Sequence, residues 1–153
     1  MNQRRQVYVQ PGEVHWSEEP CIFKTVLGSC VSVCLWDPAR QIGGLNHFML
    51  PWAKPGDESA RFGNVAIPRL IAVLQELGCT DMVAKVFGGA AVLPIGGYGA
   101  VGERNTHTAM MLMQEHCIPV IAQRTGGTLG VVIRYFSWTG EVELRQIPGG
   151  TLP

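Results

Sequence analysis

The sequence has no excess of either charge. Across 153 residues, 12 lysines and arginines balance 12 aspartates and glutamates, and the pI is about 6.9. Proteins that bind nucleic acid or anionic membranes usually carry a basic surface, because charge attracts these phosphate-rich partners. The composition therefore gives no electrostatic reason to expect either partner.

The sequence also lacks long hydrophobic runs. No segment reaches the roughly 20 apolar residues that span a bilayer as a helix, and the charged residues 1–5 are not followed by the apolar core of a signal peptide. Cysteine pairing is absent too, because the five cysteines are odd in number and none forms a C-x-x-C pair. This usage favours free thiols in the cytoplasm over the disulfide framework of a secreted domain.

Glycine and proline, by contrast, are plentiful. Nineteen glycines and ten prolines are spread along the chain, which indicates many turns between short elements rather than a helical bundle or a disordered tail. The length suits one domain, residues 1–153, that buries roughly two thirds of its unfolded surface.

Hydrophobic periodicity predicts many strands and two helices. Strands are expected at residues 6–9, 21–25, 30–36, 42–50, 82–87, 118–123, 129–136 and 141–147. Helices are expected over residues 64–77 and from a capping candidate, Asn105, to about residue 116. Residues 52–63 form a polar loop. Strands in this number with only two helices indicate an α+β fold.

The stretch of residues 25–51 places a nucleophile and a base near each other. Cys30 opens a predicted strand, and His47 lies in the middle of the next one. With a two-residue turn at Pro38-Ala39, the two residues are predicted to lie directly opposite each other in an antiparallel hairpin, with Cβ atoms roughly 4.5–5.5 Å apart. Such a pair suits covalent catalysis by a cysteine with a histidine base.

The turn before Cys30 adds a second catalytic feature. Gly28 and Ser29 are turn-forming residues, and a thiol just after a tight turn is partly exposed. The backbone N–H groups of Ser29 and Cys30 are then free to form an oxyanion hole. A catalytic Cys30 is expected to react well below the pKa of about 8.5 of a free thiol, whereas a normal titration would favour a protein that acts only by binding.

Two other roles are open to these residues. Most free cysteines are small buried hydrophobes, which is the expected role of Cys34, Cys79 and Cys117. Cys30, Cys34 and His47 also supply zinc ligand types. In one strand, however, Cys30 and Cys34 would lie about 13 Å apart at the rise of roughly 3.3 Å per residue, too far for one tetrahedral ion.

Several motifs resemble the chemoreceptor glutamine deamidases of bacterial chemotaxis, the CheD family. The family's LGSCV segment is present at residues 27–31, and its GG-x-x-H-x-MLP segment at residues 43–51. The resemblance continues through RFGN, KVFGGA, IG and RN, at residues 61–64, 85–90, 95–96 and 104–105. It covers most of the chain.

The resemblance implies a protein-glutamine amidohydrolase that needs no cofactor or metal. Its catalytic set would be Cys30, His47 and Thr25, with Ser29 and Gly28 supporting the oxyanion, and Thr25 would orient His47 through its hydroxyl or carbonyl. The implied fold is a layered sandwich of mainly antiparallel or mixed sheets packed against two helices, like the deamidase domain of cytotoxic necrotizing toxins. The implied partners are chemoreceptor cytoplasmic domains, as substrates, and a CheC-type chemotaxis phosphatase.

The predicted reaction converts a glutamine side chain to glutamate and ammonia through a thioester on Cys30, with His47 transferring the protons. The alternative is a non-catalytic or mainly regulatory module that docks to chemoreceptors or to the phosphatase. The sequence departs from the family at residues 124–127, where D-T-G-G reads R-T-G-G, and at residues 130–131, where G-R reads G-V. This departure bears on substrate or partner contacts rather than on the nucleophile.

Overall fold

The computed structural model describes residues 4–92 and 98–148. The strands in these ranges are β1 (Arg5–Tyr8), β2 (Val14–Ser17), β3 (Cys21–Leu27), β4 (Val31–Asp37), β5 (Ile42–Asn46), β6 (Val83–Gly88), β7 (Val120–Thr125), β8 (Val131–Phe136) and β9 (Val142–Gln146). The helices are α1 (Gly63–Glu76) and α2 (Tyr98–Glu115). Within the described ranges, neither helix combines the length and hydrophobicity needed to cross a bilayer.

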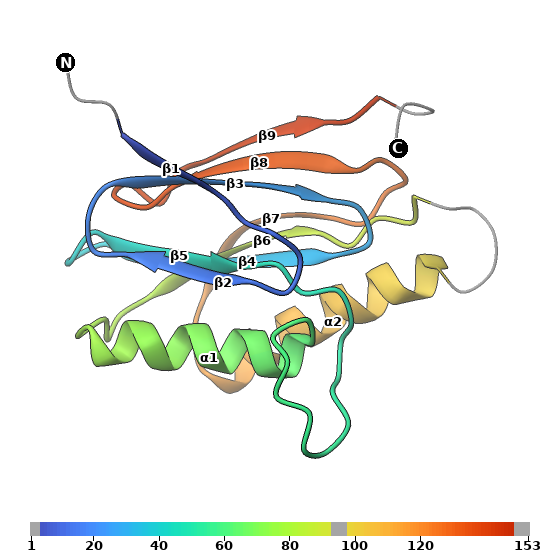
Figure 1. The fold of residues 1–153 in the computed structure, drawn as a ribbon, viewed down its shortest axis with the longest axis horizontal. Coiled ribbons are helices and arrows are strands. Elements are labelled where there is room, and N and C mark those ends of the chain that lie inside the picture. Colours follow the sequence, from blue (N-terminus) through green and yellow to red (C-terminus); the bar gives the residue numbers. More distant parts are fainter. Residues whose placement is uncertain (1–3, 93–97, 149–153) are drawn as a thin grey trace.

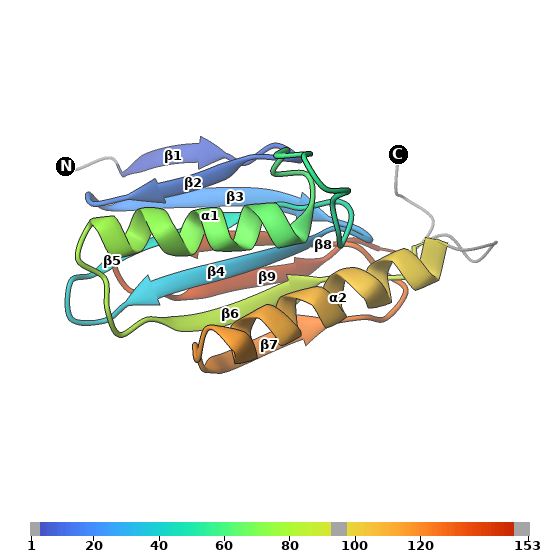
Figure 2. The same ribbon diagram turned by 90° about the horizontal axis from the view of Figure 1, so that it is seen from below.

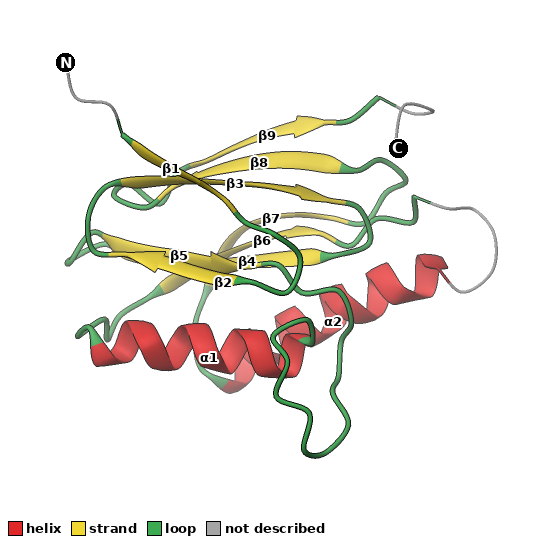
Figure 3. Ribbon diagram, viewed as in Figure 1, coloured by secondary structure: helices red, strands yellow, loops and turns green. Residues whose placement is uncertain are grey.

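These elements form three layers (Figures 1 and 3). One sheet has the strand order β1-β3-β8-β9, and it faces a second sheet of order β2-β5-β4-β6-β7. Both sheets are mixed, since β1 pairs with β3 and β6 with β7 in parallel, whereas the other pairs are antiparallel. Both helices cover the outer face of the second sheet, α1 over β2 and β5 and α2 over β4, β6 and β7 (Figure 2). The predicted α+β layered sandwich is confirmed.

Alternate residues of β4 face two separate cores, as its sequence pattern predicts. Val31, Val33 and Leu35 belong to the helix–sheet core, which also contains Ile67, Leu70, Ile71 and Leu74 of α1. The opposite face contributes to the intersheet core, which consists of Val9, Cys21, Phe23, Leu27, Cys34, Leu45, Phe87, Val131, Ile133 and Tyr135. One strand thus connects both hydrophobic layers.

Helix α1 confirms the prediction over residues 64–77. Its buried residues recur at the helical spacing that predicted it, and they pack on the sheet. Gly78 ends the helix with a φ of +89°, a conformation that glycine adopts without steric cost.

Two element predictions were incomplete or wrong. Strand β2 was not predicted, because it is an edge strand of only four residues, too short for its alternation of apolar and polar residues to stand out. Helix α2 begins at Tyr98 rather than Asn105. Asn105 is therefore an interior helical residue and not a cap.

The β4–β5 hairpin has a different register from the predicted one. Cys34 pairs with Leu45 instead of Gly43, and Asp37 pairs with Ile42, so the turn spans residues 38–41 rather than two residues. Cys30 and His47 are therefore not directly opposed. Because side chains alternate with a period of two, a shift of two positions leaves every side chain on its predicted face.

The longer turn is stabilised by its own residues. The Asp37 side chain accepts hydrogen bonds from the backbone N–H groups of Ala39 and Arg40, at 2.9 and 3.1 Å. Gln41 has a φ of +55°, and its N–H donates to the Asp37 carbonyl at 2.8 Å. Aspartate commonly caps a turn through its side chain in this way.

Candidate active site

Cys30 lies in the loop that connects the two sheets. This loop leaves β3 in one sheet and enters β4 in the other, at the right-hand end of the sandwich in Figure 1. Cys30 is half-buried, and its side chain packs against the edge of the intersheet core. A thiol in this position lies between the sheets and near solvent.

The backbone of this loop is held through its carbonyl groups. The carbonyls of Gly28 and Cys30 accept hydrogen bonds from the N–H groups of Ala90 and Gly89, at 3.0 and 2.9 Å. In residues 4–92 and 98–148, the backbone N–H groups of Ser29 and Cys30 make no hydrogen bond to another residue, and the Cys30 N–H interacts only with its own side chain. Two adjacent donors in a held loop can stabilise negative charge on a substrate oxygen.

Asn105 is a site residue that the sequence reading missed. Its side chain is fully buried, and its Nδ2 group donates to the carbonyls of Ser29, at 2.9 Å, and Met49, at 3.0 Å. It therefore ties the loop before Cys30 to the segment after His47. Its place in the RN motif at residues 104–105 was the only signal in the sequence.

His47 and Thr25 meet across the two sheets. His47 follows β5, Thr25 lies in β3, and both side chains are buried. The Thr25 Oγ1 atom lies 2.7 Å from His47 Nδ1, and the Thr25 hydroxyl also donates to the Val9 carbonyl at 2.9 Å. A carbonyl only accepts, so the single hydroxyl proton goes to Val9, and Thr25 Oγ1 accepts the proton of His47 Nδ1.

This bond determines what the imidazole can do. With the proton on Nδ1, the lone pair of Nε2 is free to accept another proton. Desolvation by burial lowers the pKa of His47 from 6.5 to about 4. His47 is therefore neutral at neutral pH, and it is available as a general base.

Burial shifts the pKa of the Cys30 thiol upward, whereas the sequence predicted a lowered pKa. Desolvation raises the pKa of the Cys30 thiol above its ordinary value of 9.0, and its own backbone N–H opposes this shift only in part. The expectation of a thiol that titrates below about 8.5 was wrong. The resting site holds a protonated thiol and a neutral imidazole, so the thiol needs a base when it attacks.

Cys30 and His47 lie on the same face of the sheet. Val31 pairs with Phe48, and Cys34 pairs with Leu45. This register places Ser32 opposite His47. Cys30 is then diagonal to His47, a relation that corresponds to about 7–8 Å in a regular ladder. No hydrogen bond joins the two side chains in the described part of the chain, so proton transfer requires a side-chain adjustment.

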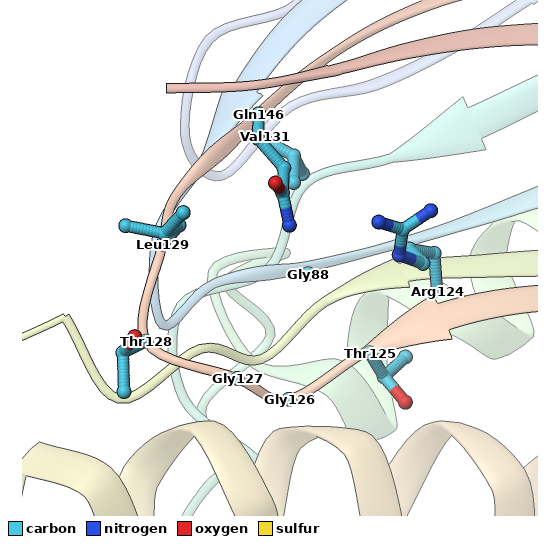
Figure 4. A pocket seen from close by; sticks show the side chains of 9 residues that line it. All are labelled: Gly88, Arg124, Thr125, Gly126, Gly127, Thr128, Leu129, Val131 and Gln146. Carbon is cyan, nitrogen blue, oxygen red and sulfur yellow. The ribbon is translucent and has the colours of Figure 1, made fainter. Parts of the chain in front are cut away.

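A cavity of about 270 Å³ opens at the same end of the sandwich. It is lined by Gly88, Arg124, Thr125, Gly126, Gly127, Thr128, Leu129, Val131 and Gln146 (Figure 4). Gly88 pairs with Val31, and a side chain at Gly88 would collide with the Cys30 carbonyl. The cavity therefore begins beside Cys30, and it includes residues 124–127, where the sequence departs from the family motif.

Comparisons with known proteins agree with the motif resemblance. Residues 49–146 match the family model described as CheD chemotactic sensory transduction. The chain is 45% identical over 150 residues to the probable chemoreceptor glutamine deamidase CheD of Rhodospirillum rubrum, covering 96% of this chain and 85% of that protein. It is 41% identical over 147 residues to the probable chemoreceptor glutamine deamidase CheD 1 of Anaeromyxobacter dehalogenans, with 94% and 86% coverage. The corresponding protein of Sulfurimonas denitrificans is 39% identical over 145 residues, with 92% and 93% coverage.

Proposed function

The chain belongs to the CheD family, and on this premise we propose that it hydrolyses glutamine side-chain amides of chemotaxis receptors to glutamate and ammonia. The names of its relatives support this reaction and this substrate class. The observation that carries the proposal is the bond between Thr25 and His47, which leaves Nε2 of a neutral imidazole as a base on the face that Cys30 shares.

In the first step, the Cys30 sulfur attacks the carbon of the glutamine side-chain amide. His47 Nε2 takes the thiol proton as the sulfur–carbon bond forms, because burial raises the pKa of the Cys30 thiol and disfavours a preformed thiolate. The negative charge moves to the amide oxygen, where the N–H groups of Ser29 and Cys30 can donate to it.

In the second step, the carbon–nitrogen bond breaks. The imidazolium returns its proton to the leaving nitrogen, ammonia departs, and a thioester remains on Cys30. Water then attacks the thioester as His47 takes a proton from it, and the Cys30 thiol leaves in its protonated form. Each cycle consumes one water and releases one ammonia.

The proposed setting is the cytoplasm, with receptor cytoplasmic domains as substrates. All five cysteines are free thiols, which supports a reducing compartment. A CheC-type phosphatase remains a predicted partner, and co-purification of the two proteins would test it. A regulatory role through docking alone is the competing proposal, and it differs in predicting no chemical change in the receptor.

The test is to incubate the protein with receptor cytoplasmic fragments and to measure ammonia and peptide masses. The wild-type protein should add about one dalton to specific glutamines without cutting the chain, because the amide and not the backbone is hydrolysed. Cys30→Ala should abolish this conversion. Cys34→Ala is the matched control, since Cys34 lies in β4, the strand that follows Cys30, and is buried in the intersheet core. Conversion that persists in Cys30→Ala, or wild-type protein that binds the fragments without converting them, would contradict the proposal.

A further inference from the structure

The end of the five-stranded sheet arranges the site residues in a row. Strands β5, β4, β6 and β7 are neighbours in that order. His47 follows β5, Cys30 precedes β4, Gly88 ends β6, and Arg124 lies near the end of β7. With strands about 4.8 Å apart, β7 lies about 10 Å from β4. The cavity is therefore on the side of Cys30 opposite to His47.

Two polar side chains face this cavity from opposite sheets. Arg124 pairs with Phe87, and Gln146 pairs with Val131. Phe87 and Val131 both belong to the intersheet core, and directly paired residues share a face of their sheet. Arg124 and Gln146 thus point into the space between the sheets, as Figure 4 shows.

The cavity offers hydrogen-bond donors without an acidic partner. No aspartate or glutamate lines it, and Arg124 makes no ion pair in the part of the chain that the structure describes. A guanidinium carries five donors and no acceptor, and its planar shape matches a carboxylate in a two-bond arrangement. The Gln146 amide can add a further donor from the other sheet.

We infer that this cavity is a subsite for an acidic side chain that flanks the target glutamine, and that Arg124, with Gln146, determines this preference. The glutamine amide would lie at Cys30, beside β4, while a carboxylate on the substrate enters the cavity. Counted from β4, Gly88 is on the next strand, β6, and Arg124 is on the strand after it, β7. This inference rests on the proposed deamidation, because it concerns the sequence around the glutamine that is converted.

The experiment uses a receptor fragment in which mass spectrometry has located a converted glutamine. Exposed positions within four residues of that glutamine are changed to glutamate, glutamine or lysine, and kcat/KM is measured for each fragment. The wild-type protein should prefer the glutamate-flanked fragment over the lysine-flanked one by about tenfold, as expected for a charge-assisted contact replaced by repulsion.

The protein variants separate the subsite from a general effect of charge. Arg124→Ala should remove most of the preference, and Arg124→Glu should reverse it in favour of lysine, with each variant judged by the ratio of its kcat/KM values on the glutamate-flanked and lysine-flanked fragments. Arg145→Ala is the matched control. Arg145 is an exposed arginine next to Gln146 that faces the other side of β9, so its removal should leave the preference unchanged.

The outcomes distinguish this inference from the proposed function. Equal rates on the three fragments, or a preference that Arg124→Glu does not alter, would overturn the subsite while the deamidase activity stands. Absence of ammonia and of mass change with every fragment would overturn the proposed function, and the subsite with it.

Discussion

The two cores that share β4 differ in what they bury. The helix–sheet core consists of apolar side chains and one cysteine, and α2 adds the buried polar side chains of Asn105 and Thr108 beside it. The intersheet layer also buries Thr25, Ser32 and His47, as well as the Tyr135 hydroxyl, which donates to the Leu35 carbonyl at 2.7 Å. Buried polar groups are costly unless they are hydrogen-bonded. Two facing sheets can each contribute one member of a polar pair, as they do for Thr25 and His47.

This difference separates stability from chemistry. Apolar packing of α1 on the sheet supports the fold. The buried polar groups at one end of the sandwich, which are the Thr25–His47 pair and Asn105 of α2, support the proposed reaction. Substitutions in the two layers are therefore expected to change different quantities.

The largest effect on activity in this comparison is expected from His47→Asn. This change removes the base from the intersheet layer, and loss of a general base typically lowers kcat by about 10²- to 10⁴-fold. Ammonia release from a receptor fragment would measure it. His107→Asn, at an exposed position of α2, should retain nearly full activity, and comparable losses in both variants would contradict the assignment.

A smaller effect is expected from Thr25→Val, which keeps the shape and removes the hydroxyl. The Val9 carbonyl and His47 Nδ1 then lose their partner, so the free energy of unfolding should fall by about 1–3 kcal/mol. Activity should fall on the order of 10- to 100-fold, because the tautomer of His47 is no longer determined. Thr25→Ser restores the hydroxyl and should recover most of the activity. If Thr25→Val were as active as the wild type, Thr25 would have no positioning role.

The smallest effect on activity is expected from Leu70→Ala in the helix–sheet core. Leu70 is fully buried, and its truncation should lower the free energy of unfolding by about 2–5 kcal/mol, as measured by urea denaturation. The activity of the folded protein at low temperature should change by less than about twofold, because Leu70 belongs to the helix–sheet core and the Thr25–His47 pair lies between the two sheets. A large loss of kcat in fully folded Leu70→Ala would show that the two layers are coupled.

Local patterns in the sequence were sufficient for much of this architecture. The alternation in β4 and the apolar face of α1 follow from neighbouring residues, and the structure confirms them. The chain also bends at Gly28 and Ser29, where a tight turn was predicted. The face shared by Cys30 and His47 was also predicted correctly, because a register shift of two positions preserves it.

The features that were missed depend on hydrogen bonds, backbone conformation and burial rather than on hydrophobic periodicity. The turn length follows from the positive φ of Gln41 and the Asp37 side-chain bonds, which hydrophobic periodicity does not report. Asn105 is a good cap by propensity, but its two carbonyl partners lie 76 and 56 residues away in sequence. The raised pKa of the Cys30 thiol follows from burial, which only the packed fold reveals.

The central claim is that the intersheet layer holds His47 as a neutral base, and the pH dependence of kcat/KM tests it most directly. Burial lowers the pKa of His47 to about 4, so the neutral fraction, and with it kcat/KM, should fall only as the pH approaches 4. The unfolded chain binds this proton at its ordinary pKa of about 6.5. The contribution of the neutral His47 to the free energy of unfolding is therefore fully present above pH 6.5 and is lost as the pH falls toward 4. Circular dichroism must for this reason confirm that the protein is folded at each pH. An acid limb with its midpoint near 4 in folded protein is the predicted result, and a midpoint near 6.5 would contradict the account.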